Sequence, residues 1–485
     1  MTVAGDLQQL RVEQINIRGN AKLSLDGSTI LAKQLELSDG KWRGNFTVDR
    51  LKLGSITAPI PAQFTAARLS GNFAATGDLT KFEPSRQTLA GNGELDLDGE
   101  KIRATDLKLE RGNFSSDLAI SNFKLGRVNN SISSQLQAGK LTGKFKVAGN
   151  IDRLTPLAIQ TSGNGRIKLP TGGEIIANNF QLVSGNWQSN LAVRGLRLGD
   201  VNRDLAAPIR AGLLVGNFRA AGNLRSPVPE RLQVSGNGNL QNILGGKVII
   251  SNLLLANGRW QSKINADRLN LSELAKFAPN KNLDPKLLSG RLSADWQINC
   301  NLNSNNLASL QVIGETKLSN LQTGSLKFDP NLTGNVSVNP GQGVDLKFSG
   351  ISDRLALSLD RNFQLQSFAI NKQGVSAIGN VNDPDNTSGN RILDVAVERF
   401  PLPLIQAFIP QNTNIQQYRF DGNATGKLAL NLNNYQVISD RIEITKPTFG
   451  AFQGDRLLTN FRYANGRLNL DNTEIQRGNN SYLIN

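Results

Sequence analysis

The sequence contains no histidine, one cysteine and one methionine among its 485 residues. Without imidazole the chain has no Ser/His/Asp or Cys/His catalytic arrangement and no histidine-based metal site. Cys300 has no second cysteine with which to form an internal disulfide or to share a metal ion. These absences exclude thiol redox and zinc-cluster chemistry, and we expect no metal and no cofactor.

Long apolar runs are also absent. No window approaches the ~18 consecutive apolar residues of a membrane-spanning helix. Residues 248–250 and 253–255 are among the longest runs, and the first residues lack the basic and apolar regions of a secretory leader. Taken as it stands, the chain is predicted to be either cytosolic or an internal piece of a longer protein.

The positive charge is dispersed along the chain. There are 54 Lys plus Arg against 39 Asp plus Glu, a net charge of +15, yet no two basic residues are adjacent. Chance placement would give about six such pairs. Nucleic-acid-binding segments carry basic runs interleaved with aromatics, and only four Trp and four Tyr occur here. We therefore predict no nucleic-acid binding, although a diffuse positive field could still attract anionic surfaces.

Internal repeats dominate the organisation. A Gly-X-aromatic marker recurs at Trp42, Phe114, Trp187 and Trp260, with spacings of 72, 73 and 73 residues. Two further markers keep the same period. They are Leu-Ser/Thr/Val-Gly-X-aromatic, as at residues 69–73, 141–145 and 214–218, and Gly-Asn, as at residues 19–20, 91–92, 163–164 and 236–237.

The markers divide the chain into repeats. The period degrades after about Gly314, and the chain begins and ends within the pattern without a recognisable cap, which we interpret as an internal fragment. The predicted divisions are a partial repeat at 1–18, repeats at 19–90, 91–162, 163–235 and 236–313, a degenerate longer repeat at 314–421 and a partial repeat at 422–485.

Apolar and polar residues alternate within each repeat. Phe46 and Val48 alternate with polar neighbours, as do Phe145 and Val147 with Lys144 and Lys146. This period of two predicts antiparallel strands with one apolar and one wet face, the wet face carrying the basic residues. Turn residues every 8 to 14 positions predict about 40 strands, six per repeat, in a sheet that must curl because a flat sheet of that size is unstable.

Two segments predict short helices. Residues 271–279 place Leu271, Leu274 and Phe277 at helical spacing, with Ser272 as the expected cap and Pro279 as the stop. Residues 401–410 repeat this pattern, and the stretches after Leu53, Leu125 and Leu198 suggest loops or weak helices. We interpret these segments as crossover helices at the end of the sheet, in preference to a binding role.

No catalytic constellation is found. Asp96, Asp98, Gly99 and Glu100 superficially resemble a calcium loop, but an EF-hand needs a glutamate at position twelve, where Leu107 stands, and flanking helices. A turn between strands is the better interpretation. We therefore predict that the protein is not an enzyme.

Several segments resemble the TamB family. They are Leu269 to Leu271, Phe277, Pro279 and residues 288–292, together with their echo at 400–410 followed by Gly422 and Gly426. TamB belongs to the AsmA-like, bridge-like lipid transfer superfamily, and the Asn-rich, basic character is similar to its cyanobacterial and chloroplast-envelope branch. The resemblance does not extend to the family's N-terminal membrane anchor or to its C-terminal conserved domain, so attachment and partner contacts do not follow from it.

The resemblance implies a location and partners as well as a fold. The implied fold is an all-β, long, curled, mostly antiparallel sheet that forms a U-shaped groove with short crossover helices. The implied location is the periplasm or cell envelope, with anchoring by segments absent from this chain. The implied partners are phospholipid acyl chains, the inner and outer membranes and an outer-membrane Omp85-type barrel protein, and the implied role is lipid transport that supports outer-membrane biogenesis or protein translocation.

The apolar face supplies the candidate groove. For each of its residues, ordinary core is as good an interpretation as lipid contact. A repetitive β-rich adhesin or spacer is the alternative function, and a polysaccharide-acting β-helix enzyme is the third. The candidate lining residues are Phe46, Val48, Leu95, Leu97, Leu118, Ile120, Phe145, Val147, Leu191, Val193, Phe218, Leu253 and Leu255.

Overall fold

The protein is all-β and forms two compact units. Unit 1 comprises residues 1–239 with 254–258, and unit 2 comprises residues 240–253 with 259–485. The computed structural model describes residues 2–4, 15–25, 27–55, 62–80, 83, 86–127, 133–153, 155, 157–226, 228–276, 288–302, 309–324, 326–382, 391–406, 420–434, 436–450, 452–465 and 467–484.

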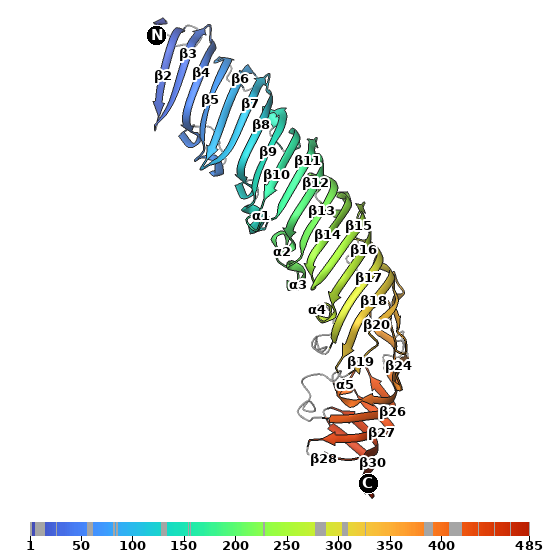
Figure 1. The fold of residues 1–485 in the computed structure, drawn as a ribbon. Helices are drawn as coiled ribbons and strands as arrows, with labels where there is room; N and C mark the ends of the chain where they lie inside the picture. Colours follow the sequence, from blue (N-terminus) through green and yellow to red (C-terminus); the bar gives the residue numbers. More distant parts are fainter. Residues whose placement is uncertain are drawn as a thin grey trace. The chain divides into compact units, whose positions relative to one another are not determined.

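Unit 1 is an open antiparallel sheet in which each strand pairs with its predecessor and its successor, so the strands follow one another in chain order (Figure 1). Strands β14 (Gln233–Ile243) and β15 (Gly246–Ala256) contain the division between the units. The other strands of unit 1 are β1 (Thr2–Ala4), β2 (Asn16–Leu25), β3 (Ser28–Ser38), β4 (Lys41–Lys52), β5 (Arg68–Asp78), β6 (Thr88–Leu97), β7 (Glu100–Glu110), β8 (Asn113–Lys124), β9 (Lys140–Asn150), β10 (Gln160–Lys168), β11 (Glu174–Val183), β12 (Asn186–Arg197) and β13 (Leu213–Asn223).

Unit 2 is likewise an antiparallel sheet with strands in chain order, and the short strands β19 and β28 lie beside the turns that follow β18 and β27. The predicted all-β antiparallel fold with short crossover helices is confirmed. The strands of unit 2 are β16 (Arg259–Asn270), β17 (Leu288–Asn301), β18 (Gln311–Thr323), β19 (Leu326–Lys327), β20 (Asn331–Asn339), β21 (Gly343–Ser349), β22 (Arg354–Leu359), β23 (Leu365–Lys372), β24 (Val375–Asn382), β25 (Ile392–Pro401), β26 (Phe420–Asn431), β27 (Val437–Phe449), β28 (Phe452–Gln453), β29 (Arg456–Ala464), β30 (Arg467–Arg477) and β31 (Asn480–Ile484).

Two-residue turns of the X-Gly type close many hairpins. Asp39 and Gly40 join β3 to β4 with φ values of 52° and 72°. Asp98 and Gly99 join β6 to β7 with φ values of 54° and 88°. Two consecutive positive φ angles define the type I′ turn, whose twist matches that of the strands and which favours Asn or Asp followed by Gly. The segment that resembles a calcium loop is therefore a hairpin turn.

The two faces of the sheet differ in polarity as the alternation predicts. In β9, Lys144 and Lys146 are exposed, whereas Phe145 and Val147 are half-buried. In β4, exposed Asn45 and Thr47 donate side-chain hydrogen bonds to Gln34 Oε1 at 2.8 Å and to Asn72 Oδ1 at 2.9 Å. The outer face is therefore a solvated lattice of polar side chains, and the inner face is apolar.

Each repeat of unit 1 contributes four strands among the described residues, and the prediction of six is wrong. The sets are β2–β5, β6–β9 and β10–β13. The strands run to 9–12 residues, and about fifteen residues of each repeat form the crossover after its third strand. Counting every turn-like residue as the end of a strand overestimated the number of strands, because several of these residues form bulges inside strands.

The Gly-Asn marker builds a β-bulge. The asparagine side chain accepts a hydrogen bond from a backbone N–H on the next strand, at a residue with a φ of 52–54°. This contact fixes the extra residue that bends the strand. The bonds run from Gln34 N to Asn20 Oδ1 at 3.0 Å, from Asp106 N to Asn92 Oδ1 at 2.9 Å and from Asn179 N to Asn164 Oδ1 at 2.7 Å.

The Leu-Ser/Thr-Gly marker holds a second bulge. Ser70 Oγ accepts from the backbone N–H of Arg50 at 3.0 Å, and Thr142 Oγ1 accepts from Asn122 N–H at 3.3 Å. In the third repeat the hydroxyl is replaced by Val215, and the register shift between β12 and β13 contains Gly195 with a φ of 59°. Glycine tolerates this φ without a side-chain partner, which explains the substitution.

The repeated aromatics cover glycines on the neighbouring strand. Trp42 lies opposite Gly77, and a Cβ added to Gly77 would lie 2.5 Å from Trp42 Nε1. The ring of Phe73 lies over Gly71 and Gly93, where an added Cβ would lie 2.7 and 2.9 Å from Phe73 Cζ. An aromatic ring that occupies the space above a glycine restores the apolar contact that the glycine lacks.

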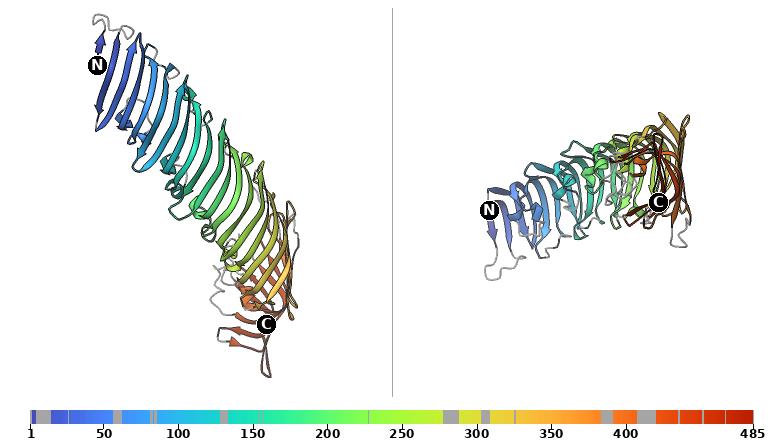
Figure 2. Two further views of the ribbon diagram at one scale, coloured as in Figure 1. Left: turned by 45° about the horizontal axis from the view of Figure 1, so that its top comes forward. Right: turned by 90° about the horizontal axis from the view of Figure 1, so that it is seen from below.

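Crossovers line one edge of the sheet of unit 1 (Figure 2). In each repeat the residue after the third strand donates its N–H to the residue before the fourth, as Leu53 does to Ala67 at 2.9 Å. Leu125 to Gly139 and Leu198 to Gly212 repeat this bond at 3.0 and 2.9 Å. The crossovers contain the 3-10 turns η2 (Leu53–Ser55), η3 (Ala62–Phe64) and η5 (Leu125–Arg127) and the helices α1 (Ser134–Gln137), α2 (Leu198–Val201) and α3 (Ala207–Arg210).

Helix α4 (Leu271–Ala275) occupies the first predicted helical segment. Asn270, and not Ser272, caps it, because Asn270 Oδ1 accepts from the Ser272 N–H at 2.9 Å. Phe277 and Pro279 lie outside the described residues. The second segment contains α5 (Leu402–Gln406), and residues 407–410 lie outside the described part of the chain.

Unit 2 has a closed apolar core. Leu332 is fully buried on β20, and it shares one cluster with Ala377 and Val397, which lie several strands further along the sheet. Leu404 of α5 lies so close to Gly324, at the end of β18, that an added Cβ would meet it at 2.5 Å. The sheet of unit 2 thus packs its apolar face against itself and against α4 and α5. The other buried members of the cluster are Leu271, Leu318, Leu321, Leu326, Phe328, Phe400, Leu404, Ala424 and Ile442.

Candidate functional site

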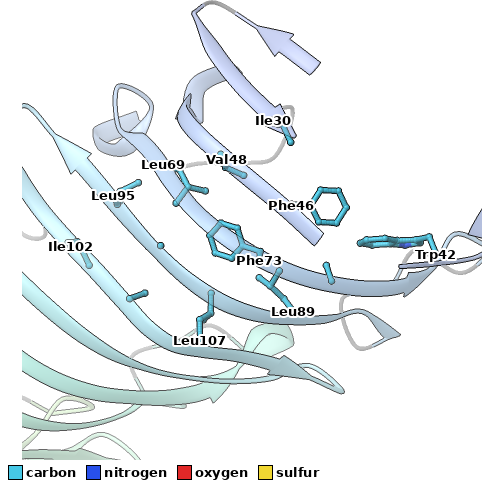
Figure 3. A pocket seen from close by; sticks show the side chains of 13 residues that line it. Ile30, Trp42, Phe46, Val48, Leu69, Phe73, Leu89, Leu95, Ile102 and Leu107 are labelled. Atoms are coloured by element: carbon cyan, nitrogen blue, oxygen red, sulfur yellow. The ribbon is translucent and has the colours of Figure 1, made fainter. Parts of the chain in front are cut away.

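The inner face of unit 1 contains an open apolar hollow of about 580 Å³ over β3–β7. The strands curve around it, and the labelled side chains point into it (Figure 3). No lining residue carries a charge. The lining residues are Ile30, Trp42, Phe46, Val48, Leu69, Phe73, Ala75, Leu89, Gly93, Leu95, Ile102, Ala104 and Leu107.

The sequence places these side chains through strand periodicity and register. Phe46 lies directly opposite Phe73, and Leu69 lies opposite Leu95, so the same face continues from strand to strand. The rings of Trp42 and Phe46 meet edge to face with centroids 6.0 Å apart. The two bulges in each repeat bend the strands toward this face, and this bending makes the apolar surface concave.

A small apolar cluster flanks the hollow at the crossover edge. Leu97 is 2% exposed and packs with Ala67 and Phe123. The crossover residues Leu53 and Phe64 cover this cluster, and the rings of Phe64 and Phe123 stack with centroids 6.5 Å apart. A second cluster, of Leu169, Val193 and Leu196, lies over β10–β12. These clusters attach the crossovers to the sheet and leave the remaining inner face open.

Three of the candidate lining residues line the hollow, namely Phe46, Val48 and Leu95. Leu97 and Ile120 belong to the edge cluster. Leu118 lies between Ala104 and Phe145 on neighbouring strands, and Phe145 contacts Phe180 edge to face at 6.4 Å. Val147 lies opposite Ser116 and Thr161 on the neighbouring strands. Val193 and Phe218 belong to the second cluster, and Leu191 lies opposite Phe218. Leu253 and Leu255 are half-buried on β15, on either side of exposed Leu254.

Sequence reasoning missed several lining residues. Trp42 and Phe73 were identified as repeat markers without a role in the groove, and Ile102 and Leu107 were not selected. All four occupy the apolar position of the two-residue alternation, which was the available signal. The bulge at Asp106 inserts one extra residue, so Ala104 and Leu107 face the same side although they are three positions apart. A search for residues that alternate every two positions therefore does not select Leu107.

Ionisable groups lie outside the hollow. Glu94 projects on the outer face, where hydrogen bonds from Lys101 Nζ at 2.9 Å and Arg103 Nη2 at 2.7 Å lower the pKa of its carboxyl. Glu100 is buried at the crossover edge. Burial raises the pKa of Glu100, but the hydrogen bonds from Arg127 Nε at 2.8 Å and from the Lys124 N–H at 3.1 Å outweigh it, so the pKa is lowered overall.

Polar groups for chemistry are scarce near the hollow. Trp42 Nε1 is buried and has no hydrogen-bond partner among the described residues. Within the described ranges no group of three or more Cys, Asp or Glu side chains could hold a metal ion. The helices in that part of the chain are all too short or too polar to cross a membrane. The lining can therefore bind apolar matter.

Comparisons with known proteins give no relative. No family model, no curated protein and no solved structure matches the chain.

Proposed function

We propose that unit 1 is a non-enzymatic lipid-binding segment whose apolar trough holds phospholipid acyl chains and passes them between membranes, in the manner that the resemblance to TamB implies. We define the trough as the open inner face of β3–β7. The observation that carries the proposal is the uncharged, concave lining of this face, open to solvent although it consists almost entirely of carbon.

Transfer energetics support this occupant. Moving a CH₂ group out of water is worth about 0.8 kcal/mol, so a 16-carbon chain in water costs roughly 13 kcal/mol. The lining offers Leu, Ile, Val, Phe and Trp side chains in place of water. Such a surface would lower the barrier to lipid movement without any chemical step.

The dimensions of the trough also fit an acyl chain. Five strands spaced at about 4.8 Å span about 19 Å from the first to the last. One leaflet of a bilayer core is about 15 Å thick, which is the length of one acyl chain. The inner face continues past the hollow through Leu118, Phe145 and Phe180. A chain that leaves the hollow would therefore meet further apolar side chains.

A structural spacer is the second candidate, and unit 2 favours it. The apolar face of unit 2 is filled by its own core, which leaves Leu332 and Ala424 with no exposed surface. A segment whose apolar face is filled in this way can serve as a rigid spacer, and it offers no free apolar surface to a ligand. The proposal for unit 1 and the spacer role for unit 2 can both hold.

Site-specific photo-crosslinking tests the proposal. The full chain would carry a photoreactive phenylalanine analogue at Phe46, inside the trough, or at Arg43, on the outer face of the same strand. After incubation with radiolabelled phosphatidylcholine vesicles, we expect lipid adducts at position 46 and none at position 43. Equal labelling at both positions, or no labelling at 46, would contradict a lipid-binding trough.

A matched pair of substitutions sharpens the test. Leu107→Asp introduces a charge into the trough, whereas Lys108→Asp changes the adjacent outward-facing residue of β7. We expect Leu107→Asp to reduce co-purified phospholipid, measured by mass spectrometry, by about tenfold, because burying an unpaired carboxylate beside an acyl chain is unfavourable. Lys108→Asp should leave the lipid content unchanged. Circular dichroism would verify that both variants fold.

A further inference from the structure

Four cations form a row across the outer face of unit 1, near its crossover edge. Lys124 on β8 is the register partner of Lys140 on β9, and Lys140 is the partner of Lys168 on β10. Lys168 pairs with Glu174 on β11, which in turn pairs with Arg194 on β12. We call Lys124, Lys140, Lys168 and Arg194 the basic row. All four are exposed.

The row is not explained by internal ion pairing. Directly opposed side chains on antiparallel strands have Cβ atoms about 5 Å apart, and like charges at that distance destabilise the sheet. Lys124 Nζ lies 3.5 Å from Glu100, whose other oxygen Arg127 already binds. The nearest cation to Glu174 is Arg166, at 3.9 Å. No carboxylate lies within 4.0 Å of the other three cations of the row among the described residues.

The first repeat provides an internal comparison. The corresponding register one repeat earlier, on β4–β6, runs from Lys52 to Arg68 and then to Asp96, so β6 carries a carboxylate where β10 carries Lys168. Charge totals show the same contrast. Residues 1–100 carry 11 Lys plus Arg and 12 Asp plus Glu, a net charge of −1, whereas residues 101–239 carry 19 and 8, a net charge of +11. The excess positive charge of unit 1 is therefore local.

We propose that the basic row is a docking surface for a membrane that contains anionic phospholipids. Five strands at about 4.8 Å hold the row along roughly 19 Å, which presents several cations at once to a surface of many phosphates. Lysine binds phosphate as a point charge and needs no defined geometry, which suits mobile headgroups. No aromatic side chain stands in this row to stack on bases, as single-stranded nucleic acid would require. The proposal does not depend on the trough, which lies on the other face.

Vesicle co-sedimentation of the full chain tests this surface. The vesicles would be phosphatidylcholine with or without phosphatidylglycerol. The test variant is Lys140→Glu with Lys168→Glu, and the control is Lys22→Glu with Lys33→Glu, which makes the same change in charge at exposed positions of β2 and β3. Each cation near an anionic surface strengthens binding about fivefold. We expect the test variant to lose at least tenfold in partitioning onto anionic vesicles at low salt, and the control to lose less than threefold.

Several outcomes would overturn the proposal. Equal losses in the two variants would show that only the net charge matters, and equal binding of the wild-type chain to both kinds of vesicle would show that anionic lipid is not recognised. A short DNA duplex and additional phosphatidylglycerol vesicles would each be added as competitors for the bound protein. If the duplex displaces the protein at the lower concentration, nucleic acid is the preferred ligand. If the double charge reversal fails to fold, Lys140→Gln with Lys168→Gln replaces it. Crosslinking at position 46 should persist in either variant, which separates this test from that of the trough.

Discussion

Unit 1 and unit 2 use the same antiparallel strands but treat their apolar faces differently. In unit 2, twelve buried residues of the open sheet and its two short helices form one cluster. In unit 1, buried residues gather in clusters of three at the crossover edge, and the adjacent hollow stays open. The difference shows that an alternating sequence specifies which face is apolar, but it does not specify whether that face is covered.

The two units also differ in the length of some of their strands. Strands β21–β24 have only 6–8 residues, whereas those of unit 1 reach 12. Of the twelve buried cluster residues of unit 2, only Ala377 lies on these short strands, and half-buried Phe348 and Leu355 pack against the cluster from them. Leu404 of α5 lies against Gly324, directly after β18. The longer strands of unit 1 bend at regular bulges and leave space between their two ends.

The largest expected effect comes from truncating the core of unit 2. Leu332→Ala should lower the free energy of unfolding by about 3–5 kcal/mol, because Leu332 has no exposed surface and its neighbours cannot collapse fully. Leu107→Ala makes the same chemical change in the trough and should cost less than about 1 kcal/mol. Urea denaturation measures both changes in the free energy of unfolding. Hydrogen exchange, followed peptide by peptide, shows in which unit the loss of stability occurs. Similar losses would mean that the trough is packed as tightly as the core.

The second effect concerns the crossover edge that borders the open trough. Glu100→Gln should cost about 2–3 kcal/mol, because the Glu100 side chain is 5% exposed and Arg127 would lose its charged partner. The lowered pKa means that the charged Glu100 stabilises the fold above its ordinary pKa of about 4.3, and this stability is lost as the pH falls through the lowered value. The variant should therefore show a flatter dependence of unfolding on acid pH than the wild type.

A control for this prediction is Glu110→Gln. The Glu110 side chain is 73% exposed, and its nearest cation is 4.0 Å away. We expect no measurable change in the free energy of unfolding, because water and salt screen so exposed a pair. A flattened profile in both variants would show that the contribution of Glu100 is not specific to its buried contacts.

A smaller effect would test the origin of the curvature. Asn92→Ala removes the acceptor for the Asp106 N–H and should cost about 1 kcal/mol, with faster exchange of that amide. Asn92→Asp keeps an acceptor oxygen and should retain most of the protection. If the two variants behave alike, the side chain of Asn92 is not what holds the bulge.

The smallest effect is expected on the outer face. Glu36→Gln breaks an ion pair with Arg43 whose side chains are 36% and 68% exposed. Such pairs contribute at most about 0.5 kcal/mol, since water and salt screen them. The midpoint of urea unfolding should therefore hardly move. A decrease in the free energy of unfolding of more than about 1 kcal/mol would show that the polar side chains on the outer face of unit 1 stabilise the fold as strongly as buried apolar residues do.

Much of the fold was predictable from local patterns. The alternation at Phe145 and Val147 identified both faces of β9, and the Asp39–Gly40 turn identified a hairpin. The number of strands was not predictable in the same way, because residues such as Asp106 look like turn residues yet form bulges inside a strand. Of the candidate site, Phe46, Val48 and Leu95 were found. Leu97 was placed on the correct face, but the crossover that covers it could not be seen in the sequence.

The sequence by itself determined the antiparallel strands, the apolar and polar faces, the period of about 72 to 74 residues and the absence of histidine chemistry, since each depends only on residue type and on spacing along the chain. Only the tertiary structure decided which part of the apolar face is open, because that depends on contacts as distant as Leu404 with Gly324. It also decided that Lys124, Lys140 and Lys168 lie side by side, although no two basic residues are adjacent in the chain. Strand register brings together side chains that the sequence separates by tens of residues.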